Sequence, residues 1–211
     1  YQKATKRIID IVLSCLLILI FGIPAFIIGI LIKTTSIGPI FADVPERIGQ
    51  HGKRFKMYKF RSMVQNAHEM LRTDPRYKDL YKKYKKGSYK LQKDPRITPI
   101  GKFIRKHSLD ELPQVLNVLN GDMSLVGPRA YYPDELENQQ KEYPHARDLV
   151  KTVLAVKPGI TGLWQVSGRS EINFDERIVI DARYVEQISL SKDVVIIAKT
   201  PLVMITGKGA V

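Results

Sequence analysis

Two adjacent carboxylates, Asp110 and Glu111, are the residues of this 211-residue chain whose types and spacing best suit chemistry. They lie just before, or in the first turn of, a helix predicted over residues 113–120. Carboxylates beside helix-terminal amides and arginines would suit a phosphate bridged by a metal ion. An Asp could then act as nucleophile toward phosphorus while Mg²⁺ shields the charge between them.

The same two residues also have a structural interpretation. Ser108 followed three residues later by Glu111 is the pattern of a capping box, and acidic residues near a helix N-terminus complement its dipole. Pro113 suits the first position of that helix, and Gly121 supplies its stop. The spacing alone leaves a capping role and a catalytic role open.

Two glycine-containing loops bring further candidates. Residues 121–129 combine Asp122 with Arg129, whose guanidinium can bind phosphate oxygens in a forked geometry. Residues 157–169 contain three glycines and the only tryptophan, and they end in Arg169. Glycine-rich turns let the backbone approach a ligand closely, although an ordinary loop held by the tryptophan explains the segment equally well.

Composition narrows the class of protein. The sequence has no GxxxxGK[ST] phosphate loop, no HExxH and no GxSxG, so its chemistry rests on carboxylates and cations. The single cysteine, Cys15, excludes a disulfide framework and a cysteine-based metal site. With 34 Lys and Arg against 21 Asp and Glu, the formal net charge of +13 predicts a polyanionic partner: nucleic acid, anionic lipid or a phosphorylated substrate.

The elements that must position these residues begin with an apolar segment, residues 11–32, which carries no charge and is long enough to cross a bilayer. Pro24, close to Gly22, removes a helical hydrogen bond at the middle of this segment. Lys and Arg residues both precede and follow the segment. These features favour a re-entrant helix that breaks near Pro24 and returns to the same side. A Pro-kinked transmembrane anchor is the alternative, whereas no small-residue cleavage site supports a signal peptide.

The segments that follow predict a mixed α and β domain. Residues 39–44 and 54–63 are typical of two strands joined by a hairpin at 49–52. In the basic stretch 65–93, tyrosines share one face of a predicted helix. That face suits either a membrane interface or packing on the domain. Its members are Tyr77, Tyr81 and Tyr84.

Two C-terminal segments complete the domain. Helical spacing of apolar residues from Ile178 to Ile188 predicts a helix, on which Arg177 and Asp181 are placed to pair four residues apart. Residues 194–205 are apolar but short and contain Pro201. This segment is therefore expected to lie along a membrane surface or to close the core, not to span.

In their order along the chain, these segments resemble the bacterial sugar transferases, the monotopic polyprenyl-phosphate phosphoglycosyltransferases. The resemblance covers nearly the whole chain and is strongest for the catalytic domain of undecaprenyl-phosphate galactose and glucose phosphotransferases. The matching segments are KRIIDIVLS before the apolar stretch, MYKFRSM at 57–63, GKFIRKHSLDELPQ at 101–114, NVLNGDMSLVGPR at 117–129, KPGITGLWQVSGR at 157–169 and DARYVEQISLSKDVVIIAKT at 181–200. Two departures are that Gly22-Ile23-Pro24 replaces the usual Ser-Pro break and that Ala130 replaces the usual Pro after Gly-Pro-Arg.

The resemblance implies transfer of a sugar 1-phosphate from a UDP-sugar to undecaprenyl phosphate, with release of UMP. It is the first membrane step of lipopolysaccharide, capsule or exopolysaccharide synthesis. Asp110 would attack the sugar-proximal phosphorus and carry the phosphosugar covalently, and Glu111 would join Asp110 in holding Mg²⁺. The other implied site residues are Lys59, Arg105 and Arg129, which would bind phosphate, and Asp122, Arg169 and Asp181, which would bind or orient substrate.

The implied fold is α+β and mostly helical. A re-entrant membrane hairpin (residues 1–36) precedes a cytosolic catalytic domain (residues 37–211) with a small β-hairpin and interfacial amphipathic helices. The implied partners are a UDP-sugar, undecaprenyl phosphate and inner-membrane lipids, with no nucleic acid, at the cytoplasmic face of the bacterial inner membrane. The sugar, the uracil-reading residues and a homodimer stay open. The alternative function is a non-catalytic membrane-tethered basic module that binds anionic lipid or nucleic acid.

Overall fold

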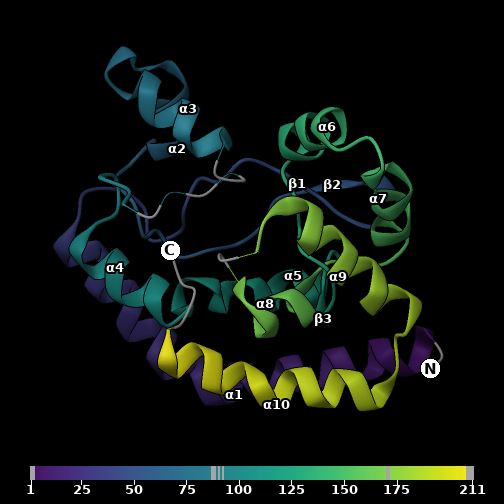
Figure 1. Ribbon diagram of the computed structural model, residues 1–211. Helices are drawn as coiled ribbons and strands as arrows, with labels where there is room; N and C mark the ends of the chain where they lie inside the picture. The colour runs from purple at the N-terminus through teal and green to yellow at the C-terminus, as the bar shows by residue number, and fades with distance from the viewer. Residues whose placement is uncertain (1–2, 87–88, 90, 92, 170–171, 208–211) are drawn as a thin grey trace.

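The computed structural model describes residues 3–86, 89, 91, 93–169 and 172–207 and is mostly helical with two small sheets (Figure 1). This confirms the predicted α+β class. The outer limits of the two predicted domains, residues 1–2 and 208–211, lie outside the described residues. The elements are α1 (Lys3–Thr35), β1 (Arg47–Ile48), η1 (Gln50–Gly52), β2 (Arg54–Phe55), α2 (Ala67–Thr73), η2 (Pro75–Tyr77), α3 (Lys78–Lys86), α4 (Pro99–Lys106), η3 (Leu109–Gln114), α5 (Val115–Asn120), β3 (Ser124–Val126), α6 (Pro133–Glu142), α7 (Ala146–Leu154), β4 (Gly159–Thr161), α8 (Leu163–Ser167), α9 (Phe174–Glu186) and α10 (Leu190–Thr206), where η marks a 3₁₀ helix.

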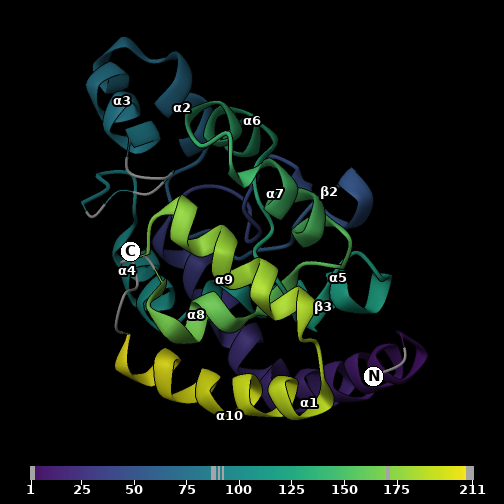
Figure 2. The ribbon, with the colours of Figure 1, turned by 45° about the vertical axis from the view of Figure 1, so that its right-hand side comes forward.

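Helix α1 contains the apolar segment and runs without interruption through Pro24. The predicted break into two helices at this residue is therefore not seen, although Figures 1 and 2 show that the helix bends along its length. A proline inside a helix removes one hydrogen bond and commonly causes such a bend without ending the helix. Residues Ala4–Thr35 are long and apolar enough to cross a membrane.

The first turns of α1 are fastened to the rest of the chain by polar contacts. Lys6 Nζ lies 2.6 Å from Asp193 Oδ2 of α10, and Arg7 Nη2 donates to the Leu119 carbonyl over 2.9 Å. The buried Asp10 carboxylate accepts hydrogen bonds from the Ser124 hydroxyl and from the backbone N–H of the next residue, both in β3. The N-terminal end of the helix therefore belongs to the folded domain.

The last turns of α1 are held by apolar packing. Ile28 and Ile32 are buried in one cluster with Phe60 and with Ile104 of α4. Beyond the helix, Arg61 Nη2 donates to the Ser36 carbonyl over 3.0 Å. Both ends of α1 thus contact the same domain.

The central sheet depends on glycines that let two strands approach closely. Strands β3 and β4 are parallel, with Ser124 opposite Gly159 and Val126 opposite Thr161. A Cβ atom on Gly159 would lie 2.1 Å from the backbone N of Gly127, so neither strand leaves room for a side chain there. The 157–169 segment is therefore a strand followed by α8, where the sequence had predicted a loop.

Two apolar clusters hold the helices of the domain together. One apolar cluster joins α6, α7 and α9 through Phe174, Ile178 and Ala182, and a second joins β3 to α9 and α10 through Tyr184 and Ile196. Helix α10 runs beside α1 in both views (Figures 1 and 2). The side chains of Val194, Leu202 and Ile205 on α10 are exposed. Because Ile196 lies in the core cluster, α10 helps to close the core, which is one of the two expected roles of this segment. A position along a membrane surface stays a prediction.

The tyrosine stripe of the basic segment packs inward. The rings of Tyr81 and Tyr84 stack with their centres 6.5 Å apart, and Tyr84 meets Tyr89 edge-on at 5.2 Å. Helix α3 lies at the end of the molecule away from α1 and α10 (Figure 1). The contact between Tyr84 and Tyr89 supports packing on the domain, and the interfacial interpretation of this stripe stays a prediction.

The predicted β-hairpin is present but shorter and displaced. β1 and β2 pair antiparallel through Arg47 opposite Phe55, and the connection contains His51 and Gly52 with positive φ. Upstream, residues 39–44 form only an isolated bridge, between Phe41 and Phe60. The glycine-bounded turn was correctly located, whereas the first strand was placed too early.

Candidate active site

The carboxylate pair lies in the 3₁₀ helix η3, directly after α4. Helix α4 begins at the Thr98 cap, whose hydroxyl accepts the Gly101 N–H, and its last turn carries Arg105. The pair then occupies the first turn of η3, and the chain continues into α5 until Gly121 ends the helix at φ 86°. The predicted stop at Gly121 is confirmed. Pro113, expected at the start of a helix, lies inside the 3₁₀ segment.

The capping-box interpretation of Ser108 and Glu111 is wrong. Ser108 adopts a left-handed conformation with φ 55°, and its side chain makes no capping hydrogen bond. Its hydroxyl instead accepts a hydrogen bond from Arg169 Nη2, while Glu111 pairs with Lys59. Both side chains are therefore directed to partners outside their own helix.

Asp110 and Glu111 line one cavity of about 490 Å³. The Asp110 side chain is buried, and its backbone carbonyl accepts the Phe60 N–H over 2.9 Å, which holds the 57–61 segment against η3. Glu111 Oε1 lies 2.6 Å from Lys59 Nζ on that segment. Two sequence-distant pieces thus meet at the carboxylates.

The two carboxyls differ electrostatically. Burial raises the pKa of Asp110, and the Glu111 charge adds to this effect, while the Lys59 and Arg105 cations oppose it. Burial also acts to raise the pKa of Glu111, but the charge and hydrogen bond of Lys59, with Arg169 and Arg129, outweigh it and leave that pKa below its usual range. Glu111 is therefore the more firmly ionised of the pair.

Cations from separate parts of the fold line the same cavity. All of the cations predicted to bind phosphate or orient substrate line the cavity: Lys59, Arg105, Arg129 and Arg169. The Arg129 guanidinium lies 5.4 Å from the centre of the Trp164 ring, and its Nε is 3.8 Å from Glu135 Oε1. A cavity with two carboxylates among several cations can bind a polyanion and place a nucleophile beside it.

Two predicted site residues do not line the cavity. Asp122 is not among the residues that line the cavity; its charge acts on Lys157, and its backbone N–H bonds to the Asn117 carbonyl. Asp181 is fully buried behind Arg129, accepting its backbone N–H over 3.0 Å and the Tyr131 hydroxyl over 3.1 Å. Asp181 can therefore position the arginine but not touch a ligand in the cavity.

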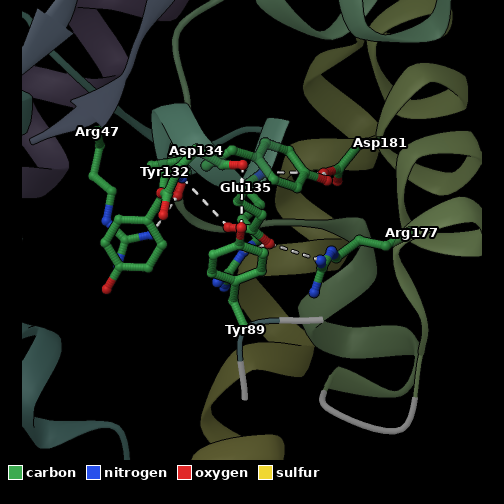
Figure 3. Close-up of polar contacts among 10 residues, drawn as sticks. Arg47, Tyr89, Tyr132, Asp134, Glu135, Arg177 and Asp181 are labelled. Carbon is green, nitrogen blue, oxygen red and sulfur yellow. Dashed lines mark hydrogen bonds and ion pairs between the residues drawn. The ribbon is translucent and has the colours of Figure 1, made fainter. Parts of the chain in front are cut away.

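The predicted pairing of Arg177 with Asp181 is replaced by a longer-range contact. Arg177 Nη2 lies 3.0 Å from Glu135 Oε1 of α6, and both side chains are fully buried (Figure 3). The neighbouring Arg129 approaches the same carboxylate, so Glu135 ties α9 to the cavity wall. The spacing of residues along α9 could not predict that Arg177 pairs with a residue of α6.

The sequence matches a known family over nearly its full length. Residues 1–207 fit the family model described as "Bacterial sugar transferase". The chain belongs to the bacterial sugar transferase family. The resemblance of its motifs is confirmed by this match.

Named relatives of this sugar transferase include an undecaprenyl-phosphate galactose phosphotransferase from Salmonella typhimurium, 46% identical over 99% of this chain and 42% of its own length. The exopolysaccharide production protein ExoY of Rhizobium meliloti is 40% identical over 92% of this chain and 83% of its own. A UDP-glucose:undecaprenyl-phosphate glucose-1-phosphate transferase from Escherichia coli is 34% identical over 94% of this chain and 40% of its own length. The chain thus spans less than half of the length of several relatives that it matches.

Some residues that line the cavity of this sugar transferase were not predicted for it. Arg47 lies 3.3 Å from the centre of the Tyr132 ring and donates to the Ala130 carbonyl. His68 meets Tyr132 edge-on, and burial with the nearby arginines lowers its pKa to about 3, so it is neutral at physiological pH. Long-range contacts of this kind leave no periodic signal in the sequence.

The carboxylates fit Mg²⁺ only together with a ligand. Among the described residues, no group of three or more His, Cys, Asp or Glu side chains forms a ready metal site. Mg²⁺ is usually held by one or two carboxylates together with water and substrate phosphates. Asp110 and Glu111 match that smaller requirement.

Asp181→Asn is expected to make the stability of this sugar transferase less dependent on pH. Burial raises the Asp181 pKa to about 7, above the unfolded value near 4, so the folded state holds a proton that the unfolded state releases. The parent should therefore lose stability as pH rises from about 4 to 7. Relative to the parent, the variant should gain roughly 3 kcal/mol in free energy of unfolding between pH 5 and pH 8.

Urea unfolding in detergent, followed by circular dichroism at both pH values, measures this difference. The asparagine oxygen can still accept the Arg129 and Tyr131 hydrogen bonds, so the fold is retained. Equal differences between variant and parent at pH 5 and pH 8 would contradict the raised pKa.

Proposed function

We propose that this chain transfers a sugar 1-phosphate from a UDP-sugar to undecaprenyl phosphate, with UMP as the second product. The observation that carries the proposal is the position of Asp110 and Glu111 in one cavity with Lys59, Arg105 and Arg129. The names of the Salmonella and Escherichia relatives, which include undecaprenyl phosphate and a sugar, support the same substrates. The name of the ExoY relative supports a role in exopolysaccharide production.

The reaction proceeds through two displacements at one phosphorus atom. An Asp110 carboxylate oxygen attacks the sugar-proximal phosphorus, and the bond from that phosphorus to the bridging oxygen breaks, so UMP leaves with the electron pair. A phosphate oxygen of the lipid then attacks the same phosphorus and displaces the Asp110 carboxylate. The product is a polyprenyl diphosphate sugar, and Asp110 is regenerated.

The cations lower the repulsion between anionic nucleophiles and an anionic diphosphate. Lys59 and Arg105 lie close enough to oppose the rise in the Asp110 pKa, and Arg129 and Arg169 act on Glu111 in the same way. Fixed charges of this kind stabilise the additional negative charge that develops on phosphate oxygens in the transition state. Mg²⁺ held by Asp110, Glu111 and substrate phosphates would supply further charge neutralisation.

A donor panel tests this function. The protein, reconstituted in nanodiscs with undecaprenyl phosphate, should release UMP from at least one member of a series of UDP-sugars, and EDTA should stop the release. Product analysis should show a lipid diphosphate sugar in equal amount. No UMP release with any donor would instead favour a non-catalytic basic module that binds anionic lipid.

We further propose that α1 enters the cytoplasmic face of the bacterial inner membrane and returns to it. A straight helix of 33 residues is about 50 Å long, enough to place its ends on opposite sides of a bilayer. Here both ends are fastened to one domain, through Asp10 at the start and Ile32 at the end. The exposed side chains of Leu19, Ile23 and Phe26 would then face lipid.

Cysteine labelling tests this topology. In a Cys15→Ser background, Thr5→Cys and Thr35→Cys should both resist a membrane-impermeant maleimide in intact spheroplasts and both react in inverted vesicles. Both positions are exposed, so the reagent can reach them from water. Labelling of Thr5→Cys in spheroplasts would instead show that α1 is a transmembrane anchor.

A further inference from the structure

An apolar groove lies outside the candidate active site, along the second half of α1. Its volume is about 400 Å³, and Lys33 is its one charged member among the described residues. Phe26, 70% exposed, and the half-exposed Ile30 form its outer edge, on the lipid-facing surface proposed for α1. The complete lining is Ala25, Phe26, Gly29, Ile30, Lys33, Thr34, Ile40, Phe41 and Phe60.

Phe60 connects this groove to the carboxylates. Its ring stacks on Phe41 with 5.8 Å between centres, and the residue lines both the groove and the cavity. Its backbone N–H bonds to the Asp110 carbonyl over 2.9 Å, and its neighbour Lys59 pairs with Glu111. The apolar groove therefore ends where cations and carboxylates begin.

We propose that the groove binds the isoprene units nearest the phosphate of the polyprenyl phosphate acceptor. This inference rests on the proposed transferase function. An amphiphile with a long apolar chain and an anionic head matches an apolar groove that is open to the membrane and closed by a cationic cavity. A chain that enters beside Phe26 would pass Phe60 and present its phosphate near Lys59 and Asp110.

The shape of α1 at Gly29 explains how the groove stays open. A Cβ atom on Gly29 would meet Ile40 Cγ2 at 3.5 Å, an ordinary contact, so alanine fits without displacing the backbone. A phenylalanine ring at the same position would extend beyond that contact and occupy the groove. The absence of a side chain thus provides the space for the ligand.

Gly29→Phe is expected to raise the KM for undecaprenyl phosphate at least tenfold and to leave the KM for the UDP-sugar within twofold. Gly29→Ala should give a smaller rise in the same constant. Gly22→Phe is the matched control, because a Cβ on Gly22 meets nothing within 4 Å and the residue lies outside the groove. It should behave as the parent. Parent-like kinetics in Gly29→Phe, or an equal rise in both KM values, would overturn the proposal.

A second variant guards against loss of folding in the first. Ala25 lines the same groove one helical turn earlier, so Ala25→Phe should reproduce the selective rise in the KM for the acceptor. Thermal unfolding of each variant in nanodiscs identifies any that fail to fold. A folded Ala25→Phe protein with parent-like kinetics would count against the groove.

Photoaffinity labelling separates this inference from the transferase function, since it requires no turnover. A polyprenyl phosphate with a diazirine in its first isoprene units should label residues around Phe26, Ile30 and Phe41 in the parent and lose this labelling in Gly29→Phe. Excess undecaprenyl phosphate should compete, whereas phosphatidylglycerol should not. Labelling without UMP release would refute the transferase function alone. Labelling elsewhere, or equal competition by both lipids, would refute the groove.

Discussion

Replacement of Asp110 by asparagine is expected to lower UMP release at least about a thousandfold, because it removes the carboxylate oxygen that attacks phosphorus. The fold should be retained, since the hydrogen bond that fixes this position uses the backbone carbonyl of Asp110 and the N–H of Phe60. Single-turnover release of UMP from the best donor of the panel measures the effect. Asp148→Asn, which alters an exposed residue on α7, controls for loss of a carboxylate elsewhere.

The covalent step has its own readout. With the UDP-sugar present and the acceptor lipid omitted, the parent should accumulate a phosphosugar on Asp110 that mass spectrometry of peptides can locate. Asp110→Asn should accumulate none. An adduct on Glu111 would reverse the assigned roles, and release of UMP by Asp110→Asn at the parent rate would show that this carboxylate is not the nucleophile.

Glu111→Gln should be less severe and should differ in kind. The substitution leaves the nucleophile in place but removes the charge that pairs with Lys59 over 2.6 Å and that is offered to Mg²⁺. Activity should therefore fall with a higher requirement for Mg²⁺, measured as the metal concentration that gives half the maximal rate. The two carboxylates are adjacent in sequence, yet their different surroundings separate their roles.

Local patterns in the sequence predicted several elements because short-range physics decides them. Gly121 ends α5 in a left-handed conformation that residues with a side chain rarely adopt. The turn around Gly52 was located for the same reason. Apolar spacing likewise gave α9, with Ile178 and Ala182 buried on one face.

Other features depended on contacts that the sequence pattern does not carry. Pro24 predicted a break, but the helix continues through this residue. In its second half, Ile28 and Ile32 pack against other parts of the fold. The sequence around Ser108 fits a helix cap, but in the structure its hydroxyl accepts a hydrogen bond from Arg169, which is distant in the chain. A partner from elsewhere in the fold overrides a local preference in each case.

The candidate site shows the same division. Nothing in the spacing of Lys59, Arg105 and Arg129 indicates that they share a cavity, so their grouping was implied by the family resemblance and not by physics. Asp122 shows the limit of that transfer, because its place in a family-like motif did not bring it into the cavity. A motif preserves local sequence, whereas a site is assembled by packing.

The buried ion pair behind the cavity gives the largest expected effect on stability. Arg177→Ala should lower the free energy of unfolding by about 3–5 kcal/mol, because removing one member of a buried pair leaves the other charge without compensation. Arg177 Nη2 and Glu135 Oε1 are 3.0 Å apart, and neither side chain is exposed. Arg129 also approaches that carboxylate, at 3.8 Å, and can compensate only in part.

Urea unfolding in detergent, followed by circular dichroism, measures this loss. Lys141→Ala is the matched control, because it breaks the 2.7 Å pair between Lys141 and Glu137 on the surface of α6, where solvent already screens both charges. Its effect should be far smaller. A combined Arg177→Met and Glu135→Gln variant should recover part of the loss, since it removes both buried charges while keeping similar volumes. If Arg177→Ala were no more destabilised than Lys141→Ala, the pair would not contribute to holding α9 against the wall that carries Arg129.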